Sequence, residues 1–259
     1  HDMEQSLGFR IFERTSRGVR PTERGTVFLQ HARSILREMD SIEALGPRRP
    51  VANRLRICIP RSAAALDLVG HFIASLPETQ NLDVAIHECH ARRTLERLAN
   101  GEVEMGIIRF RTEYRDYFEE QTAQRELSLQ ILSKYRYVLI LPQSHPLAER
   151  PAIRMSELEG FVEIVHGDNL RAHGRQQNVA CRKIYTVDRM AQLTLLQRLP
   201  GAYMWGPEMP EALVERWGFV QRTCLDNQTV YHNAIILHPR YVMTEIESGY
   251  VQHILEHCK

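Results

Sequence analysis

The stretch RIFERTSRGVRPTERG occupies residues 10–25 and places an arginine at every third or fourth position. Its arginines are Arg10, Arg14, Arg17, Arg20 and Arg24. Gly18 and Pro21 lie among them, so the flanking segments FRIF (9–12) and GVRPT (18–22) predict a short hairpin. Guanidinium groups bind phosphates bidentately, and a basic hairpin therefore suits contact with a nucleic-acid backbone. On charge alone, a solvated basic hairpin is the alternative.

A long amphipathic helix is predicted directly after the hairpin, over residues 22–45. Thr22 suits the helix start, and GPRRP (46–50) reads as a linker that ends the helix. Its apolar residues recur at helical spacing: Val27, Phe28, Ala32, Ile35, Leu36, Met39, Ile42 and Leu45. This face either packs on its own domain or pairs with a second copy of the chain. Because an uncovered apolar face is a liability, we expect a homodimer.

Beyond residue 53 the pattern changes to alternating strands and helices. The expected strands are LRICI (55–59), DVAIHE (83–88), EMGII (104–108), YRYVLILP (135–142), FVEIV (161–165), AYMW (202–205) and NAIILH (233–238). The expected helices cover 62–76, 92–101, 187–199 and 241–257. Apolar strands that alternate with helices predict an α/β fold built on parallel sheets.

Composition narrows the class of protein further. The chain has 259 residues, a formal net charge of +1 and 43% hydrophobic residues, which is typical of a globular protein. No apolar run approaches the roughly 18–20 residues of a membrane-spanning helix, and the N-terminus shows no signal-peptide pattern. The five cysteines are widely spaced without metal-ligand spacing. We therefore expect a cytoplasmic protein with reduced thiols, no metal and no cofactor.

Residues 6–33, SLGFRIFERTSRGVRPTERGTVFLQHAR, closely resemble the signature of LysR-type transcriptional regulators. ILPQSHPLAERPAIRMSELEG (140–160) is similar to a segment of the family's effector domain. The resemblance implies a partial winged helix-turn-helix over residues 3–21 and a linker and dimerisation helix over 22–50. It also implies a periplasmic-binding-protein-like effector domain over 51–259. Subdomain I would comprise 51–136 and 232–259, and subdomain II 137–231.

The same resemblance implies DNA, a small effector and a second copy of the chain as partners, with tetramers left open. The expected backbone contacts to DNA are Arg14, Arg17 and Arg20, and the expected dimerisation residues are Phe28, Ile35, Met39 and Ile42. Most of the family's helix-turn-helix is not in this sequence, so we expect a truncated product without specific operator binding. An allosteric change of dimer geometry on effector binding is the implied mechanism.

Ligands of open α/β sheets bind at the carboxyl ends of the strands. Residues that follow the expected strands are therefore candidates for binding a small organic anion. They are Arg61, Ser62, His90, Arg109, His166, Asp168, Met204 and Trp205. Ser62 and Arg109 also match positions that the family uses for its effector.

Each candidate has a structural alternative. Ser62 could cap a helix, and Arg109 could pair with Glu88 or Glu113. His90 and His166 could be solvated loop residues, and Trp205 could belong to the core. Asp168 argues against a simple dianion as the effector.

Three other functions are alternatives to a regulator that binds a small effector. An enzyme is disfavoured because the sequence lacks GxSxG, HExxH, a Walker loop and a GxGxxG after a strand. An exported solute-binding receptor would need a signal region. A thiol-redox-sensing regulator of the same family stays open, because sequence does not show whether a thiolate is activated.

Overall fold

The computed structural model describes residues 2–16, 18–44, 53–78, 81–167, 182–239 and 241–257. At the N-terminus, helix α1 (Asp2–Leu7) precedes an antiparallel hairpin of β1 (Phe12–Thr15) and β2 (Gly18–Pro21). The hairpin was predicted, but its first strand begins at residue 12 rather than 9. The Glu4 carboxylate of α1 accepts hydrogen bonds from the amides of Ile11 at 2.7 Å and Phe12 at 3.2 Å. These bonds fix the start of β1 beside α1.

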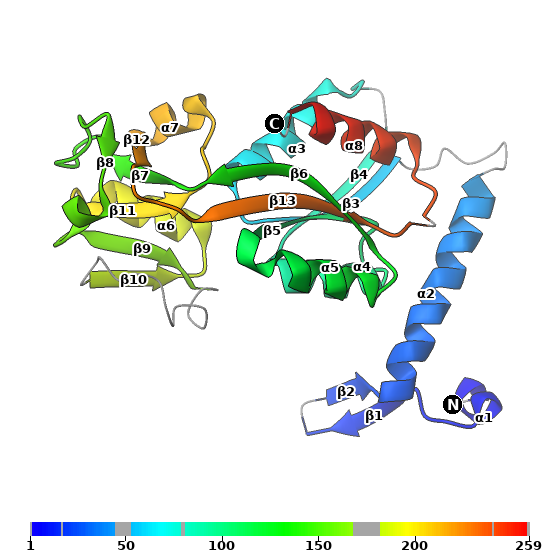
Figure 1. Cartoon of the computed structure of the whole chain (residues 1–259). Coiled ribbons are helices and arrows are strands. Elements are labelled where there is room, and N and C mark those ends of the chain that lie inside the picture. Colours follow the sequence, from blue (N-terminus) through cyan, green and yellow to red (C-terminus); the bar gives the residue numbers. More distant parts are fainter. Residues whose placement is uncertain are drawn as a thin grey trace.

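Helix α2 (Glu23–Ala44) follows the hairpin and stands away from both large sheets (Figure 1). The Thr22 hydroxyl caps it by accepting from the Gly25 amide at 2.9 Å, and donates to the Arg10 carbonyl at 2.6 Å. Gly25 is required here, because a β-carbon at this position would clash with the Ile11 carbonyl.

The rest of the chain forms two α/β lobes. We call residues 53–136 and 230–257 lobe I, and residues 137–229 lobe II. Lobe I holds a five-stranded sheet in the order β4-β3-β5-β13-β6. Its strands are β3 (Asn53–Ile59), β4 (Leu82–Glu88), β5 (Met105–Arg111), β6 (Ser128–Arg136) and β13 (Val230–Leu237). β3 pairs in parallel with β4 and β5, whereas β13 pairs antiparallel with β5 and β6.

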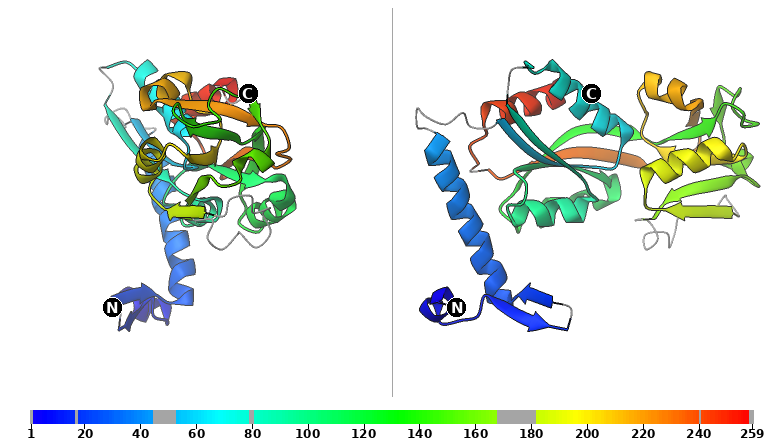
Figure 2. Two further views of the ribbon diagram at one scale, coloured as in Figure 1. Left: turned by 90° about the vertical axis from the view of Figure 1, so that its left-hand side faces the viewer. Right: turned by 180° about the vertical axis from the view of Figure 1, so that it is seen from behind.

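Helices cover both faces of the lobe I sheet (Figure 2). They are α3 (Ala63–Ser75), α4 (Ala91–Ala99), the short η1 (Thr112–Tyr114), α5 (Arg115–Ala123) and α8 (Glu245–His257). α3 and α8 pack on one face through Val69, Phe72 and Tyr250. α4 and α5 contribute Leu95 and Phe118 to the core on the opposite face.

Lobe II holds a six-stranded sheet in the order β10-β9-β11-β7-β12-β8. Its strands are β7 (Val138–Pro142), β8 (Ala152–Ile153), β9 (Val162–His166), β10 (Arg182–Thr186), β11 (Ala202–Gly206) and β12 (Phe219–Cys224). Its helices are η2 (Met155–Leu158), α6 (Arg189–Arg198) and α7 (Glu211–Trp217). α6 and α7 pack on one core of the sheet, and η2 contributes to the other.

The structure corrects three predicted elements. The single strand predicted over 135–142 is two strands, since the chain leaves the lobe I sheet after Arg136 and enters the lobe II sheet at Val138. The third predicted strand extends to Arg111, so Arg109 lies within β5 rather than after it. The last helix begins at Glu245 instead of 241. The change of sheet lies beside the predicted subdomain division at 136/137, whose bounds stay a prediction.

Candidate functional site

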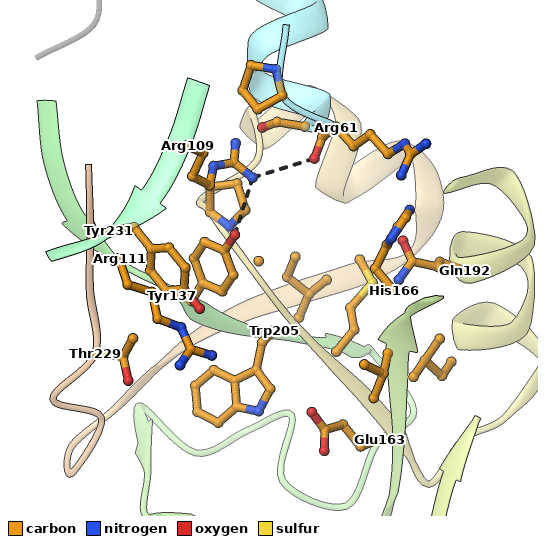
Figure 3. A pocket seen from close by; sticks show the side chains of 18 of the residues that line it. Arg61, Arg109, Arg111, Tyr137, Glu163, His166, Gln192, Trp205, Thr229 and Tyr231 are labelled. Carbon is orange, nitrogen blue, oxygen red and sulfur yellow. Dashed lines mark hydrogen bonds between the residues drawn. The ribbon is translucent and has the colours of Figure 1, made fainter. Parts of the chain in front are cut away.

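A cavity of about 920 Å³ lies between the two lobes. Lobe I supplies the segments that follow β3 and β4 and the end of β5, and lobe II supplies β9, β11 and the start of α6. Figure 3 shows the side chains that face this space. Because β3, β4 and β5 run in parallel, their carboxyl ends converge at this edge of the sheet.

The N-terminus of α3 opens onto this cavity. Ser62 caps the helix, with its hydroxyl accepting from the Ala65 amide at 3.4 Å, and the residue is only 3% exposed. The N-cap alternative is therefore observed, and it leaves other first-turn amides available. Free amides and the helix dipole attract an anion to such an end.

Arg109 reaches the same region from β5. Its Nη1 donates to the Tyr137 hydroxyl at 3.3 Å and to the Arg61 carbonyl at 3.5 Å (Figure 3). The guanidinium also lies 5.9 Å from the ring centroid of Tyr135 and 5.8 Å from that of Tyr137. Its buried Nε has no hydrogen-bond partner. A fixed cation with an unused buried N–H is a strong recognition element for an oxyanion.

No carboxylate within the described ranges lies within salt-bridge distance of Arg109. Glu88 pairs instead with Arg189 at 2.7 Å, and Glu113 pairs with Arg111 at 3.5 Å. The alternative that Arg109 pairs with either glutamate is therefore wrong. The position of Arg109 within β5, opposite Asn233, directs its side chain along the tyrosines instead.

Two tyrosines at the crossing between the lobes line the adjoining wall: Tyr137, between β6 and β7, and Tyr231 of β13, with Tyr135 of β6 behind them. We call β6 and β13 the crossing strands. The rings of Tyr137 and Tyr231 stack with centroids 3.8 Å apart and an interplanar angle of 7°. The Tyr135 hydroxyl donates to the Asn233 side chain at 3.0 Å. Burial raises the pKa of Tyr231 to about 12, so this hydroxyl is neutral at physiological pH. Arg111 lies 5.9 Å from the Tyr231 ring centroid, which places a second arginine of β5 along the same wall.

Two histidines flank the cationic end of the cavity. His90 caps α4, with Nδ1 accepting from the Arg93 amide at 3.2 Å. Desolvation and the charge of Arg61 lower the pKa of both His90 and His166 below the ordinary histidine value. Both rings are therefore neutral at neutral pH, and the positive charge of this region comes from its arginines.

The lobe II wall near Trp205 includes apolar residues and one ion pair. Met204 is 7% exposed and belongs to the core beneath α6, while half-buried Trp205 packs on the opposite core and faces the cavity. Lys183 Nζ lies 3.0 Å from Glu163 Oε2, which balances the charge there. The cavity is therefore polarised, with unbalanced cationic charge near α3 and paired charges near Trp205.

The structure places seven of the eight predicted effector-binding residues on the cavity wall. They are Arg61, Ser62, His90, Arg109, His166, Met204 and Trp205. Asp168 lies outside the described residues. Sequence reasoning missed Arg111, Tyr137, Glu163, Lys183, Arg189 and Tyr231, which also line the cavity. A signal existed for Arg189, since a cation at the first position of a helix opposes the helix dipole.

The predicted DNA and dimer residues lie outside this cavity. Arg14 and Arg20 are exposed on the hairpin, and Arg20 Nε lies 2.6 Å from Glu13 Oε1. Arg17 lies outside the described residues. On α2, the predicted dimerisation residues Ile35, Met39 and Ile42 are 61%, 52% and 66% exposed. Phe28 is instead half-buried against the ring of Phe9, at 6.5 Å between centroids.

Two thiols lie close together beside the cavity. Cys58 Sγ is 3.9 Å from Cys89 Sγ, and Cys89 lines the cavity wall. Burial raises the pKa of Cys58 to about 12, so its thiolate is scarce. Burial likewise raises the pKa of Cys224 to about 11. Cys181 and Cys258 lie outside the described residues.

Within the described ranges, no cluster of three potential metal ligands occurs. The helices described there include none long and apolar enough to cross a membrane.

Two α/β lobes with a cavity at the junction define a ligand-binding domain of the periplasmic-binding-protein-like class. The family profile described as "LysR substrate binding domain" matches residues 48–209. The chain therefore belongs to the LysR family, which confirms the resemblance and the α/β fold predicted from the sequence.

Curated relatives include two from Escherichia coli K12. The HTH-type transcriptional regulator YnfL is 30% identical over 62% of this chain and 52% of its own length. The DNA-binding transcriptional dual regulator OxyR is 26% identical over 61% of this chain and 49% of its own length. The chain thus matches about half the length of these relatives.

Solved structures share the fold. A full-length OxyR variant from Pseudomonas aeruginosa superposes with a TM-score of 0.65 at 15% identity, covering 99% of this chain and 82% of that one. LysG from Corynebacterium glutamicum, with bound effector arginine, gives 0.60 at 15% identity, covering 99% and 85%. The effector-binding domain of QuiR with shikimate gives 0.55 at 12% identity, covering 78% and 95%.

Proposed function

We propose that this chain is the sensing part of a DNA-binding transcriptional regulator, and that its cavity binds a small organic anion as effector. The observation that carries the proposal is Arg109, whose buried Nε has no partner in a cavity that also receives the N-terminus of α3. A buried cation that lacks a charged hydrogen-bond partner is energetically unfavourable. The surroundings of Arg109 therefore favour an anionic ligand. Trp205 and the stacked tyrosines suit the apolar body of such a ligand.

The matched structures with arginine and shikimate support small carboxylates as the ligand class, since both ligands named there carry a carboxylate.

A thermal-shift screen against small carboxylates, aromatic acids and amino acids tests this function. We expect at least one ligand to raise the unfolding midpoint by mass action. Arg109→Gln should weaken that ligand at least about tenfold, the loss of one charge-assisted hydrogen bond. Arg93→Gln removes an exposed arginine paired with Glu96 and should leave binding unchanged. A clean fold with no hit, or equal binding in Arg109→Gln, contradicts the proposal.

For the whole regulator we propose a homodimer through α2, with the hairpin arginines Arg14, Arg17 and Arg20 contacting DNA phosphates. The exposed apolar face of α2 and the exposed Arg14 and Arg20 support this. Effector binding would change the geometry of the dimer by favouring one arrangement of the lobes. The matched relatives carry the names of transcription regulators, which supports regulation rather than catalysis.

A thiol-redox regulator is the second candidate function, because Cys58 and Cys89 approach to 3.9 Å and several relatives are named hydrogen-peroxide-inducible genes activators. The raised pKa of Cys58 opposes it, since the thiolate is the reactive form. We therefore expect dilute peroxide to leave Cys58 and Cys89 reduced, as measured by intact mass and peptide mapping. Rapid formation of a Cys58–Cys89 disulfide would favour the redox function instead.

A further inference from the structure

The ion pair between Glu88 and Arg189 joins the two lobes beside the cavity. Glu88 ends β4 in lobe I, and Arg189 begins α6 in lobe II, with Arg189 Nη2 at 2.7 Å from Glu88 Oε1. The side chains are 34% and 22% exposed, so the contact is partly shielded from water. A short, partly buried contact of this kind is stronger than an ordinary surface pair.

Arg189 is only partly used by Glu88. It lines the cavity, and its buried Nε has no hydrogen-bond partner. Arg109 presents a second buried Nε without a partner in the same cavity. Two guanidinium groups with unused N–H donors therefore face one space, one from each lobe.

The surroundings favour an additional negative charge at Arg189. Burial lowers the pKa of Arg189, the charges of Arg109 and Arg61 add to this shift, and the carboxylates of Glu88 and, to a smaller extent, Asp188 oppose it. A cation at the first position of a helix is also unfavourable for the helix dipole. The positive charge of Arg189 is thus in an unfavourable environment. The Glu88 carboxylate stabilises this charge when the cavity holds no anion.

We propose that Glu88 acts as an internal competitor of the effector. Its carboxylate pairs with the Arg189 guanidinium in the empty cavity, and the effector anion replaces it there on binding. Binding then exchanges an ion pair between the lobes for two ion pairs to the ligand, one from Arg109 and one from Arg189. The inference rests on the proposed anion-binding function and adds two residues to it. Arg189 increases the affinity of the cavity for the anion. Glu88 decreases it, and so raises the anion concentration needed for binding.

Substitutions that remove one charge of this ion pair distinguish competition for the anion from a purely structural role of the pair. Glu88→Gln keeps a side-chain oxygen that accepts from Arg189, so the arginine stays in place, but the competing charge is lost. We expect the anion to bind about tenfold more tightly in this variant. Arg189→Gln should weaken binding about tenfold or more, although both substitutions remove the same ion pair. If the ion pair only stabilised the fold, the two variants would change binding in the same direction.

The experiment titrates inorganic phosphate and, separately, acetate into the whole chain at constant ionic strength and pH 7.5. The dissociation constant is obtained from the rise of the unfolding midpoint with anion concentration. Glu119→Gln is the matched control, because it removes the same charge from an ion pair of the same 2.7 Å length on α5. The control should bind both anions like the unsubstituted chain.

Three results decide the matter. Tighter binding in Glu88→Gln with weaker binding in Arg189→Gln supports the inference. Binding that is lost in Arg109→Gln but equal or weaker in Glu88→Gln overturns the competition while leaving the anion-binding function intact. Failure of both anions to bind the unsubstituted chain and Glu88→Gln overturns the inference, while the carboxylate screen decides the proposed function separately.

Discussion

Arg109 and Arg111 stand two positions apart on β5, so their side chains point to the same face of the sheet. Both guanidinium groups lie beside tyrosine rings of the crossing strands. Arg111 has Glu113 within 3.5 Å, whereas Arg109 has hydroxyl and carbonyl oxygens. The same strand therefore supplies one cation paired with a carboxylate and one without, and the proposed anion would bind to the second.

Sequence reasoning found the residues that follow parallel strands, such as Arg61, Ser62 and His166, because chain order alone places strand ends at one edge. It missed Tyr137 and Tyr231, which reach the cavity from the crossing strands. Their ring contact joins residues far apart in the chain, and no local pattern encodes that pairing. Arg189 had a local signal in its place at the start of a helix, but its partner Glu88 is 101 positions away, and no local pattern encodes that ion pair.

Glu104 carries a prediction about stability. Burial and the charge of nearby Glu247 raise the pKa of Glu104 to about 7, and its buried Oε2 has no partner. The Glu247 side chain accepts hydrogen bonds from the Thr244 amide at 2.7 Å and the Tyr241 hydroxyl at 2.9 Å. The folded state thus holds the Glu104 proton more tightly than the unfolded chain, and stability is lost as pH rises toward 7.

Glu104→Gln should therefore raise the free energy of unfolding at pH 8 by about 1–2 kcal/mol and change it little at pH 5. Urea unfolding at the two pH values measures this. Glu96→Gln, at an exposed ion pair, is the control and should show no such pH dependence. Destabilisation by Glu104→Gln at pH 8 would show that the ionised carboxylate has a favourable partner.

At the scale of elements, the crossing between lobes explains the main error in the predicted fold. Residues 135–142 are apolar or aromatic apart from Arg136 and contain neither glycine nor an internal proline, so the pattern favours one strand. The chain nevertheless changes sheets at Tyr137, and Asn227 secures the junction by donating to the Tyr137 carbonyl at 3.0 Å. A change of sheet depends on tertiary packing, which strand propensity does not contain. The α2 helix, by contrast, begins within one residue of its predicted start, because its capping residue is a local signal.

The exposed face of α2 leads to a prediction about assembly. Ile35, Met39 and Ile42 each exceed half exposure, and burying such a side chain contributes roughly 1.5–3 kcal/mol. We expect a dimer whose dissociation constant rises at least about a hundredfold in Ile35→Glu, since two copies of the residue are affected. Sedimentation or light scattering over a concentration series measures this. His31→Glu, on the same helix, is the comparison for added charge, and equal effects of both substitutions would contradict an apolar dimer interface at Ile35.

For the whole molecule, histidines set the expected response to acid. Desolvation lowers the pKa of six of them: His87, His90, His145, His166, His232 and His253. The unfolded chain therefore binds more protons than the folded chain below the ordinary histidine pKa of about 6.5. Stability is fully present above that value and is lost as pH falls through it.

We expect the histidines to lower the free energy of unfolding from pH 7 to pH 5, while Glu104 contributes in the opposite direction. Urea unfolding at closely spaced pH values gives this slope directly. The decrease should be steeper in Glu104→Gln, where the opposing group is absent. A free energy that rises on acidification in both proteins would show that the histidines are charged in the folded state.

We propose that an anion binds between the lobes at Arg109 and the N-terminus of α3. Amide and side-chain NMR mapping with the tightest ligand from the screen tests it most directly. We expect chemical-shift changes at the amides of Ser62 and Ala63, at Arg109 Nε and at the Trp205 indole N–H, because all four residues line one cavity. Chemical-shift changes confined to surfaces outside this cavity, with Arg109 Nε unaffected, would show that the ligand does not bind at Arg109 and the N-terminus of α3.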